Sequence, residues 1–145
     1  MAKKILGIDY GEARTGLAVS DALGLLASGI GNIEERDINR LINKIAEKVT
    51  ELSIEQIVLG NPVNMNGTLG PKAEKVAKLA ERLRVKTGLP VVLFDERCTT
   101  MAAHQFLNET NTRGKKRKGV VDTLSAQIIL QNYMDSHLLS FEERK

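Results

Sequence analysis

Residues 4–11 read KILGIDYG, an apolar run that ends in a single carboxylate, Asp9, two residues before Gly11. A continuous apolar run between turn signals is typical of a strand that is buried on both faces, at the centre of a mixed or parallel sheet. An unpaired charge at the end of such a strand is costly, so Asp9 is expected to face a cation, a metal ion or a hydrogen-bond donor. The alternative is a structural turn in which Asp9 bonds its own backbone before Gly11.

The composition is that of an ordinary globular protein. The 145 residues, 42% hydrophobic and 27% charged, predict a single domain over residues 1–145 with a sizeable core. A net charge of +3 mildly favours a polyanionic partner. Cys98 is the one cysteine, which excludes an internal disulfide and a cysteine-rich metal site. Because neither a signal-peptide core nor a bilayer-spanning stretch is present, we expect a cytoplasmic protein without membrane contact.

Hydrophobic periodicity predicts an α/β fold. Strands are expected at residues 4–9, 15–21, 25–33, 54–60 and 89–94, and helices at about 38–52, 71–88, 99–109 and 120–138. Short connections between the first three strands indicate an antiparallel meander, and the strand–helix–strand units that follow indicate parallel strands. The expected fold is a five-stranded mixed sheet, three meander strands plus two parallel strands, with helices on both faces.

Carboxylates follow two further elements. Asp95 and Glu96 end the fifth strand, and Asp122 lies in the first turn of the last helix, on a stripe that continues with residues 125, 126, 129 and 133. If the first and fifth strands are parallel, these carboxylates converge with Asp9 at one edge of the sheet. An oxygen-rich cluster of this kind suits Mg²⁺ or Mn²⁺, and two such ions could hydrolyse a phosphodiester.

Each of these acids also has a structural interpretation. Asp122 could simply stabilise a helix N-terminus, and the acids at 95–96 could form ion pairs with Arg14 or Arg97. Those two arginines could instead hold a phosphate. A basic run could grip a nucleic-acid backbone or be a solvated loop; its charged residues are Arg113, Lys115, Lys116, Arg117 and Lys118.

Four spaced stretches together resemble the bacterial YqgF/RuvX family. They are GIDYGEARTGLAVSD at 7–21, GNPVNMNGT at 60–68, DERCTT at 95–100 and KGVVD at 118–122, the last followed by Ala126 and by Ile129-Leu130. The resemblance covers nearly the whole chain in order. It implies a ribonuclease-H-like fold and a metal-dependent nuclease, with two roles attached to the family: resolution of Holliday junctions and maturation of the 16S ribosomal RNA precursor.

The resemblance also implies an acidic catalytic and metal-binding site. Carried over by motif, its members are Asp9, Glu96 and Asp122, with Asp95 as a further candidate ligand. Two other classes stay open at this point. Residues 7–11 also resemble the phosphate loop of sugar kinases and actin-like ATPases, and the chain could be a nucleic-acid-binding module without catalysis. The sequence does not decide between RNA and DNA as substrate, or between a monomer and a homodimer.

Overall fold

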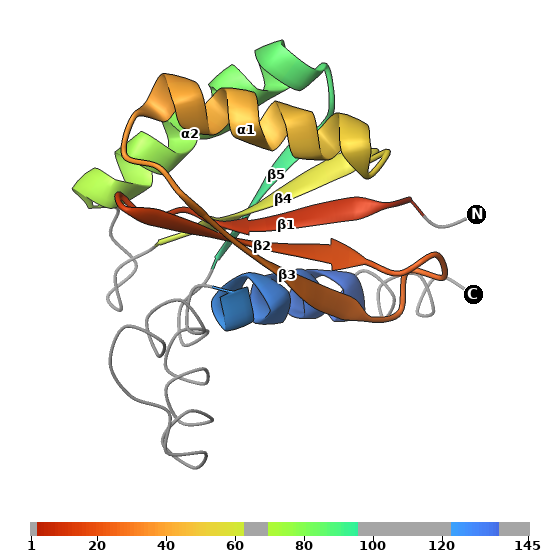
Figure 1. Cartoon of the computed structure of the whole chain (residues 1–145). Coiled ribbons are helices and arrows are strands. Elements are labelled where there is room, and N and C mark those ends of the chain that lie inside the picture. Colours follow the sequence, from red (N-terminus) through yellow and green to blue (C-terminus); the bar gives the residue numbers. More distant parts are fainter. Residues whose placement is uncertain (1–2, 63–69, 96–122, 137–145) are drawn as a thin grey trace.

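A computed structural model describes residues 3–62, 70–95 and 123–136 of the chain (Figure 1). Along the sequence the elements are β1 (Ile5–Asp9), β2 (Arg14–Ser20), β3 (Ala27–Glu34), α1 (Ile38–Glu51), β4 (Gln56–Asn61), α2 (Pro71–Thr87) and β5 (Val91–Asp95). Residues 123–136 are helical as well, drawn in blue in Figure 1. We call this segment the C-terminal helix.

The strands form one five-stranded sheet in the order β3-β2-β1-β4-β5. β1 is antiparallel to β2 and parallel to β4, and β5 continues the parallel half beside β4. The expected α/β class and mixed five-stranded sheet are therefore confirmed, with the 4–11 stretch at the centre. Since β1, β4 and β5 run in the same direction, their carboxyl ends meet at one edge of the sheet.

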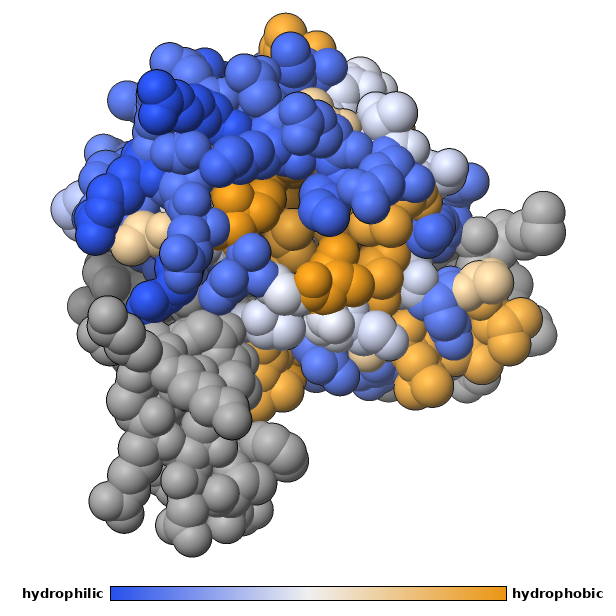
Figure 2. All heavy atoms as spheres, in the orientation of Figure 1, coloured by the Kyte–Doolittle hydropathy of each residue, from blue (hydrophilic) through white to orange (hydrophobic). Residues whose placement is uncertain are grey.

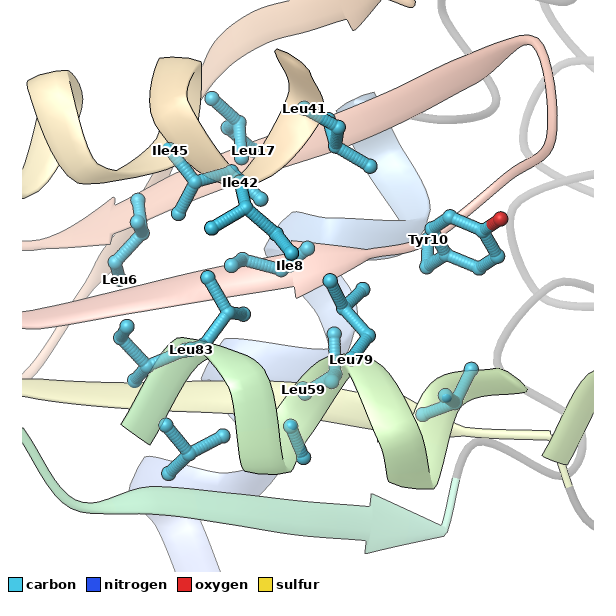
Figure 3. Packing of buried hydrophobic residues seen from close by; sticks show 14 of the residues in the cluster. Leu6, Ile8, Tyr10, Leu17, Leu41, Ile42, Ile45, Leu59, Leu79 and Leu83 are labelled. Atoms are coloured by element: carbon cyan, nitrogen blue, oxygen red, sulfur yellow. The ribbon is translucent and has the colours of Figure 1, made fainter. Parts of the chain in front are cut away.

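Helices cover both faces of this sheet. α1 and α2 lie on one face and the C-terminal helix on the other (Figure 1). Alternate residues of β1 serve the two layers: Leu6 and Ile8 pack beneath α1 and α2 (Figure 3), whereas Ile5 packs with the C-terminal helix. Full burial of a large aliphatic side chain contributes about 1.5–3 kcal/mol, so the two-sided burial of β1 holds both layers to the centre of the sheet.

Local signals account for the helix ends. The Asp37 carboxylate accepts a hydrogen bond from the backbone N–H of Asn39, 2.9 Å, and caps α1. Pro71 opens α2, and Gly88, with φ of 71°, ends it in a left-handed conformation. Both predicted ends of the helix at about 71–88 are confirmed, and the Asp37 cap explains why the first helix begins at Ile38.

Three strands begin two residues later than expected, among them the fourth, which begins at Gln56. The third strand begins at Ala27, two residues later than predicted, because the Asp21 carboxylate accepts a hydrogen bond from the N–H of Leu25, 2.8 Å, and holds the chain in a wider turn. The fifth strand begins after Pro90, which has no N–H for a ladder hydrogen bond. The helix expected at 99–109 lies outside the described residues. In the described part of the chain, no helix has the length and apolar character needed to span a membrane.

Candidate active site

Asp9 ends the central strand at the carboxyl edge of the sheet. It is half-buried, and strand alternation directs it to the face that carries the C-terminal helix, since Ile8 packs beneath the other two helices. On β2, Asp9 pairs with Gly16. On β4, Leu59 pairs with Ile8, so the next residue, Gly60, lies beside Asp9. Glycines on both neighbouring strands add no side chain beside the Asp9 carboxylate, so the sheet itself leaves this position uncrowded.

The C-terminal helix is seated closely over this face. A Cβ at Gly7 would lie 2.7 Å from the Leu130 Cβ and 3.2 Å from the Ala126 carbonyl oxygen. A Cβ at Gly29 would lie 2.5 Å from the Thr123 Cγ2. These two glycines therefore bring the helix nearer to the sheet than any side chain would allow.

Polar contacts fix the position of this helix on the sheet. The Gln131 side chain accepts a hydrogen bond from the N–H of Ala27, 2.9 Å, and donates one to the carbonyl oxygen of Leu25, 2.9 Å. The Gln56 amide donates to the Tyr133 hydroxyl, 2.7 Å. Tyr133 thus lies near the start of β4, while Thr123 lies over Gly29 of β3, so the helix runs from β3 toward the start of β4.

The inward stripe of the C-terminal helix is as predicted over the described residues. Ser125, Ala126, Ile129 and Tyr133 are all buried. Ser125 is unusual because its hydroxyl, fully enclosed, has no hydrogen-bond partner among the described residues. The sequence does not predict a buried hydroxyl without a partner here, because a single serine on an apolar helix stripe belongs to no recognisable motif.

Phe94 and Asp95, the last two residues of β5, are directed to opposite faces of the sheet. Phe94 packs on the C-terminal helix, where its ring meets Tyr133 edge-on with centroids 5.9 Å apart. Asp95 pairs with Asn61 of β4 and is exposed. Because successive strand residues point to opposite faces, Phe94 shares the face of Asp9, and Asp95 is directed to the face of α1 and α2.

Arg14 shares the face of Asp9. It is the first residue of β2, half-buried, and lies two residues before Gly16, the partner of Asp9. The even spacing of Arg14, Gly16 and Ala18 directs all three toward the C-terminal helix. The structure therefore brings together two of the predicted site residues, Asp9 and Arg14, at one edge.

A cluster of charges follows Asp9 on the other side of this edge. The Lys75 ammonium lies 2.9 Å from a Glu12 carboxylate oxygen, which lowers the pKa of Glu12 and raises that of Lys75. The charges of Arg36 and Lys72 lower the pKa of Glu12 further. These cations are not among the residues that the sequence predicted, because they come from separate segments and no spacing links them.

Most of the predicted site lies outside the described residues. This holds for Glu96 and Asp122 among the acids and for a group of cations: Arg97, Arg113, Lys115, Lys116, Arg117 and Lys118. Within residues 3–62, 70–95 and 123–136, no group of three or more acidic, histidine or cysteine side chains is arranged to hold a metal ion. Asp9 is thus the predicted catalytic residue that the structure describes.

Residues 3–136 match the RuvX family, which is described as Holliday junction resolvase. The chain belongs to this family. Curated relatives of the RuvX protein are named "Putative pre-16S rRNA nuclease". One from Ruminiclostridium cellulolyticum is 41% identical over 91% of this chain and 94% of its own length. Another, from Listeria monocytogenes, is 46% identical over 92% and 98%.

Solved structures share the fold of this RuvX chain at low sequence identity. RuvC of T. thermophilus in complex with Holliday junction substrate matches with a TM-score of 0.60 and 16% identity, over 94% of this chain and 96% of that one. The fowlpox virus resolvase with its Holliday junction DNA matches with a TM-score of 0.59 and 12% identity, over 93% and 99%. These matches confirm the predicted ribonuclease-H-like fold, and the match of residues 3–136 confirms the family resemblance.

Proposed function

We propose that this protein is a divalent-metal-dependent nuclease that hydrolyses phosphodiester bonds, with Asp9, Glu96 and Asp122 as its catalytic carboxylates. The observation that carries the proposal is the position of Asp9. It ends the buried central strand, between two glycines, on the face of the sheet that the C-terminal helix covers. A carboxylate placed there is costly unless a cation accompanies it, and membership of the RuvX family supports a nuclease.

The C-terminal helix supports Asp122 as a partner of Asp9. Its first described residue, Thr123, packs on Gly29 of β3, on the face of the sheet to which Asp9 is directed. Asp122 directly precedes Thr123 in the sequence, so the two carboxylates belong to segments that lead to the same face of the sheet.

Strand alternation supports Glu96 over Asp95 as the third carboxylate. Phe94 shares the face of Asp9 and Asp95 is directed to the opposite face, so strand geometry that continued to Glu96 would direct Glu96 to the face of Asp9. The longer Glu side chain also reaches further toward a metal ion held mainly from β1. In this proposal Asp95 orients a neighbouring group and is not a ligand.

A donor set of three carboxylates fits Mg²⁺ or Mn²⁺, which prefer oxygen ligands. Such an ion, when bound, supplies Lewis-acid chemistry that activates water and stabilises the leaving oxygen. The role of the chain would be to hold the carboxylates in position: Asp9 at the end of β1, and Asp122 directly before the C-terminal helix, which Gly7 and Gly29 allow to pack closely on the sheet. Arg14, on the same face, would bind a phosphate oxygen of the substrate.

Precursor ribosomal RNA is the substrate that the curated relatives favour, since those at 41–46% identity are named for pre-16S rRNA. The family description favours a second candidate, resolution of Holliday junctions. For either substrate, the cations outside the described residues, Arg97 and the basic run at 113–118, would bind the nucleic-acid backbone. A cytoplasmic location, one domain over residues 1–145 and a homodimer all stay predictions.

A side-by-side cleavage assay with Mg²⁺ and Mn²⁺, on a four-way DNA junction and on a 16S rRNA precursor, tests the proposal. Asp9→Asn, Glu96→Gln and Asp122→Asn should each abolish cleavage, whereas Asp95→Asn should retain it. Asp21→Asn, in the distant hairpin turn, is the matched control. Thermal melts accompany each variant, and Asp9→Asn should melt no lower than the unaltered protein, because clustered carboxylates repel one another without metal.

Four results would contradict parts of the proposal. A sharp fall in the melting temperature of Asp9→Asn would favour the structural turn. Near-normal cleavage by Glu96→Gln would remove that residue from the site. Nucleic-acid binding without cleavage under any metal would favour the non-catalytic binding module, and nucleotide binding in calorimetry would favour the kinase-like class.

A further inference from the structure

We propose that Arg36, Lys72 and Lys75 form a cationic rim that binds phosphates of the nucleic-acid substrate, and that Glu12 limits its affinity by occupying Lys75. The inference rests on the proposed nuclease function and adds a binding surface on the side of the sheet opposite Asp9. It arises from an imbalance of charge at the carboxyl edge of β1, where one carboxylate faces three cations.

The rim is built by three segments that tertiary contacts bring together. Glu12 lies in the turn between β1 and β2, and the N–H of Glu35 donates a 3.1 Å hydrogen bond to the carbonyl oxygen of Ala13 in the same turn. Arg36, the next residue after Glu35, is therefore held beside the turn. α2 contributes Lys75 through its 2.9 Å contact with Glu12.

The cations of the rim are open to a ligand. The Lys75 side chain is 55% exposed and that of Glu12 71% exposed, and Arg36 and Lys72 are exposed as well. Lys72 and Lys75 are three residues apart and so share one face of α2. Figure 2 shows hydrophilic side chains gathered over the end of the molecule where α2 begins.

The local charge is positive. The pKa of Glu12 is lowered first by its hydrogen bond to Lys75 and also by the charges of Arg36 and Lys72, so all three cations act on one carboxylate. These four groups carry a formal charge of +2. Glu74, the acid in the first turn of α2, precedes Lys75 by about 100° around the helix axis at 3.6 residues per turn and does not share its face. A polyanion is the ligand that such a surface fits.

The rim also lies close to the proposed scissile position. Glu12 follows Asp9 by three residues, so their Cα atoms are at most about 11 Å apart. That distance corresponds to roughly three nucleotides at 3.4 Å per nucleotide along one strand. A strand held at the rim would cross the sheet edge from the α2 side to the C-terminal helix and pass Asp9. The attraction at the rim would offset the repulsion between a polyanion and the acidic site.

Binding isotherms at several salt concentrations test the rim, with the four-way DNA junction as probe and Ca²⁺ in place of Mg²⁺ to suppress cleavage. Replacing Arg36, Lys72 and Lys75 together by Ala should raise Kd and flatten the slope of log K against log salt by up to roughly 1.8, at about 0.9 for each of Arg36 and Lys72, because Glu12 occupies Lys75 in the unaltered protein. Lys86→Ala is the matched control, because it removes the same charge from the same helix about 21 Å from Lys72. It should bind like the unaltered protein.

Glu12→Gln separates a binding role from a structural one. If Glu12 competes with phosphate, this variant should bind more tightly and steepen the salt slope by about 0.9, with an unchanged melting temperature. If the Glu12–Lys75 pair instead fastens the turn to α2, the variant should melt lower and bind more weakly, which would overturn the proposal.

The remaining outcomes distinguish the rim from the nuclease function. An unchanged salt slope in the triple variant, together with cleavage that depends on Asp9, would overturn the rim alone. Absence of nucleic-acid binding by the unaltered protein would overturn both.

Discussion

Adding one methyl group at Gly7 should displace the C-terminal helix and so reduce both stability and cleavage. The new Cβ of Gly7→Ala would lie 2.7 Å from the Leu130 Cβ, whereas carbon atoms pack best at about 3.5–4.0 Å. Because the Leu130 Cβ is rigidly attached to the helix, rotation of the side chain cannot relieve the contact. The helix must move outward by about 1 Å.

The size of the effect follows from two opposing terms. Overpacking of this kind destabilises by about 1–3 kcal/mol. Gly7 has ordinary strand geometry. Alanine at this position also restricts the unfolded chain, which raises the free energy of unfolding by about 0.4–1 kcal/mol. We expect a net loss of about 1–2 kcal/mol, which for 145 residues corresponds to a fall in melting temperature of about 3–7 °C. A 1 Å displacement of catalytic groups can slow the reaction about 100-fold.

Calorimetric melts and single-turnover cleavage of the same preparation measure both effects. Gly29→Ala is a second test of the same close packing, and its effect can be reversed by a second substitution, because the added Cβ would lie 2.5 Å from the Thr123 Cγ2. Thr123→Ser removes that methyl group and should restore most of the stability lost in Gly29→Ala. A Gly7→Ala variant that melts and cleaves like the unaltered protein would refute the close seating of the helix, and so would a coupling energy below about 0.5 kcal/mol in the Gly29–Thr123 cycle.

Three further predictions concern other contacts. Ser125→Ala should raise the free energy of unfolding by about 1 kcal/mol in urea titrations, because it removes a buried hydroxyl without a partner among the described residues; a loss of cleavage with this gain would give the hydroxyl a role in the site. Tyr133→Phe should lower the free energy of unfolding by about 1–3 kcal/mol, since it leaves the buried Gln56 amide without its 2.7 Å acceptor. The hydrogen bond from Lys44 lowers the pKa of Glu35 in the folded protein. The ionised Glu35 therefore stabilises the fold above its unfolded pKa, and this stabilisation is lost as pH falls through the lower folded pKa. The melting temperature of Glu35→Gln should depend less on pH between about 5 and 3 than that of the unaltered protein.

Local sequence determined the elements and the central strand. The apolar run before Asp9 predicted a strand buried on both faces, and β1 lies at the centre of the sheet with helices on either side. The Asp37 cap and the Gly88 stop were predictable because capping depends on adjacent residues. The buried stripe from Ser125 to Tyr133 was predictable from helical periodicity. The four motif stretches were sufficient by themselves to indicate the family.

The tertiary structure decided which distant residues meet. Lys75 and Glu12, 63 residues apart, form an ion pair at the edge of the sheet, and Gln131 bonds to the backbone of Ala27, 104 residues away. No local pattern encodes such pairs, because they depend on the packing of the helices on the sheet.

Two positions in the sheet illustrate the difference. Gly7 belongs to the apolar run in the sequence, but only the fold shows that the C-terminal helix packs directly against it. The order of residues 94–96 is a property of the sequence, whereas the pairing of β5 with β4 assigns Phe94 to the face of Asp9 and Asp95 to the other. Sequence defined the chemical groups, and long-range packing of strands and helices defined which of them share one side of the sheet.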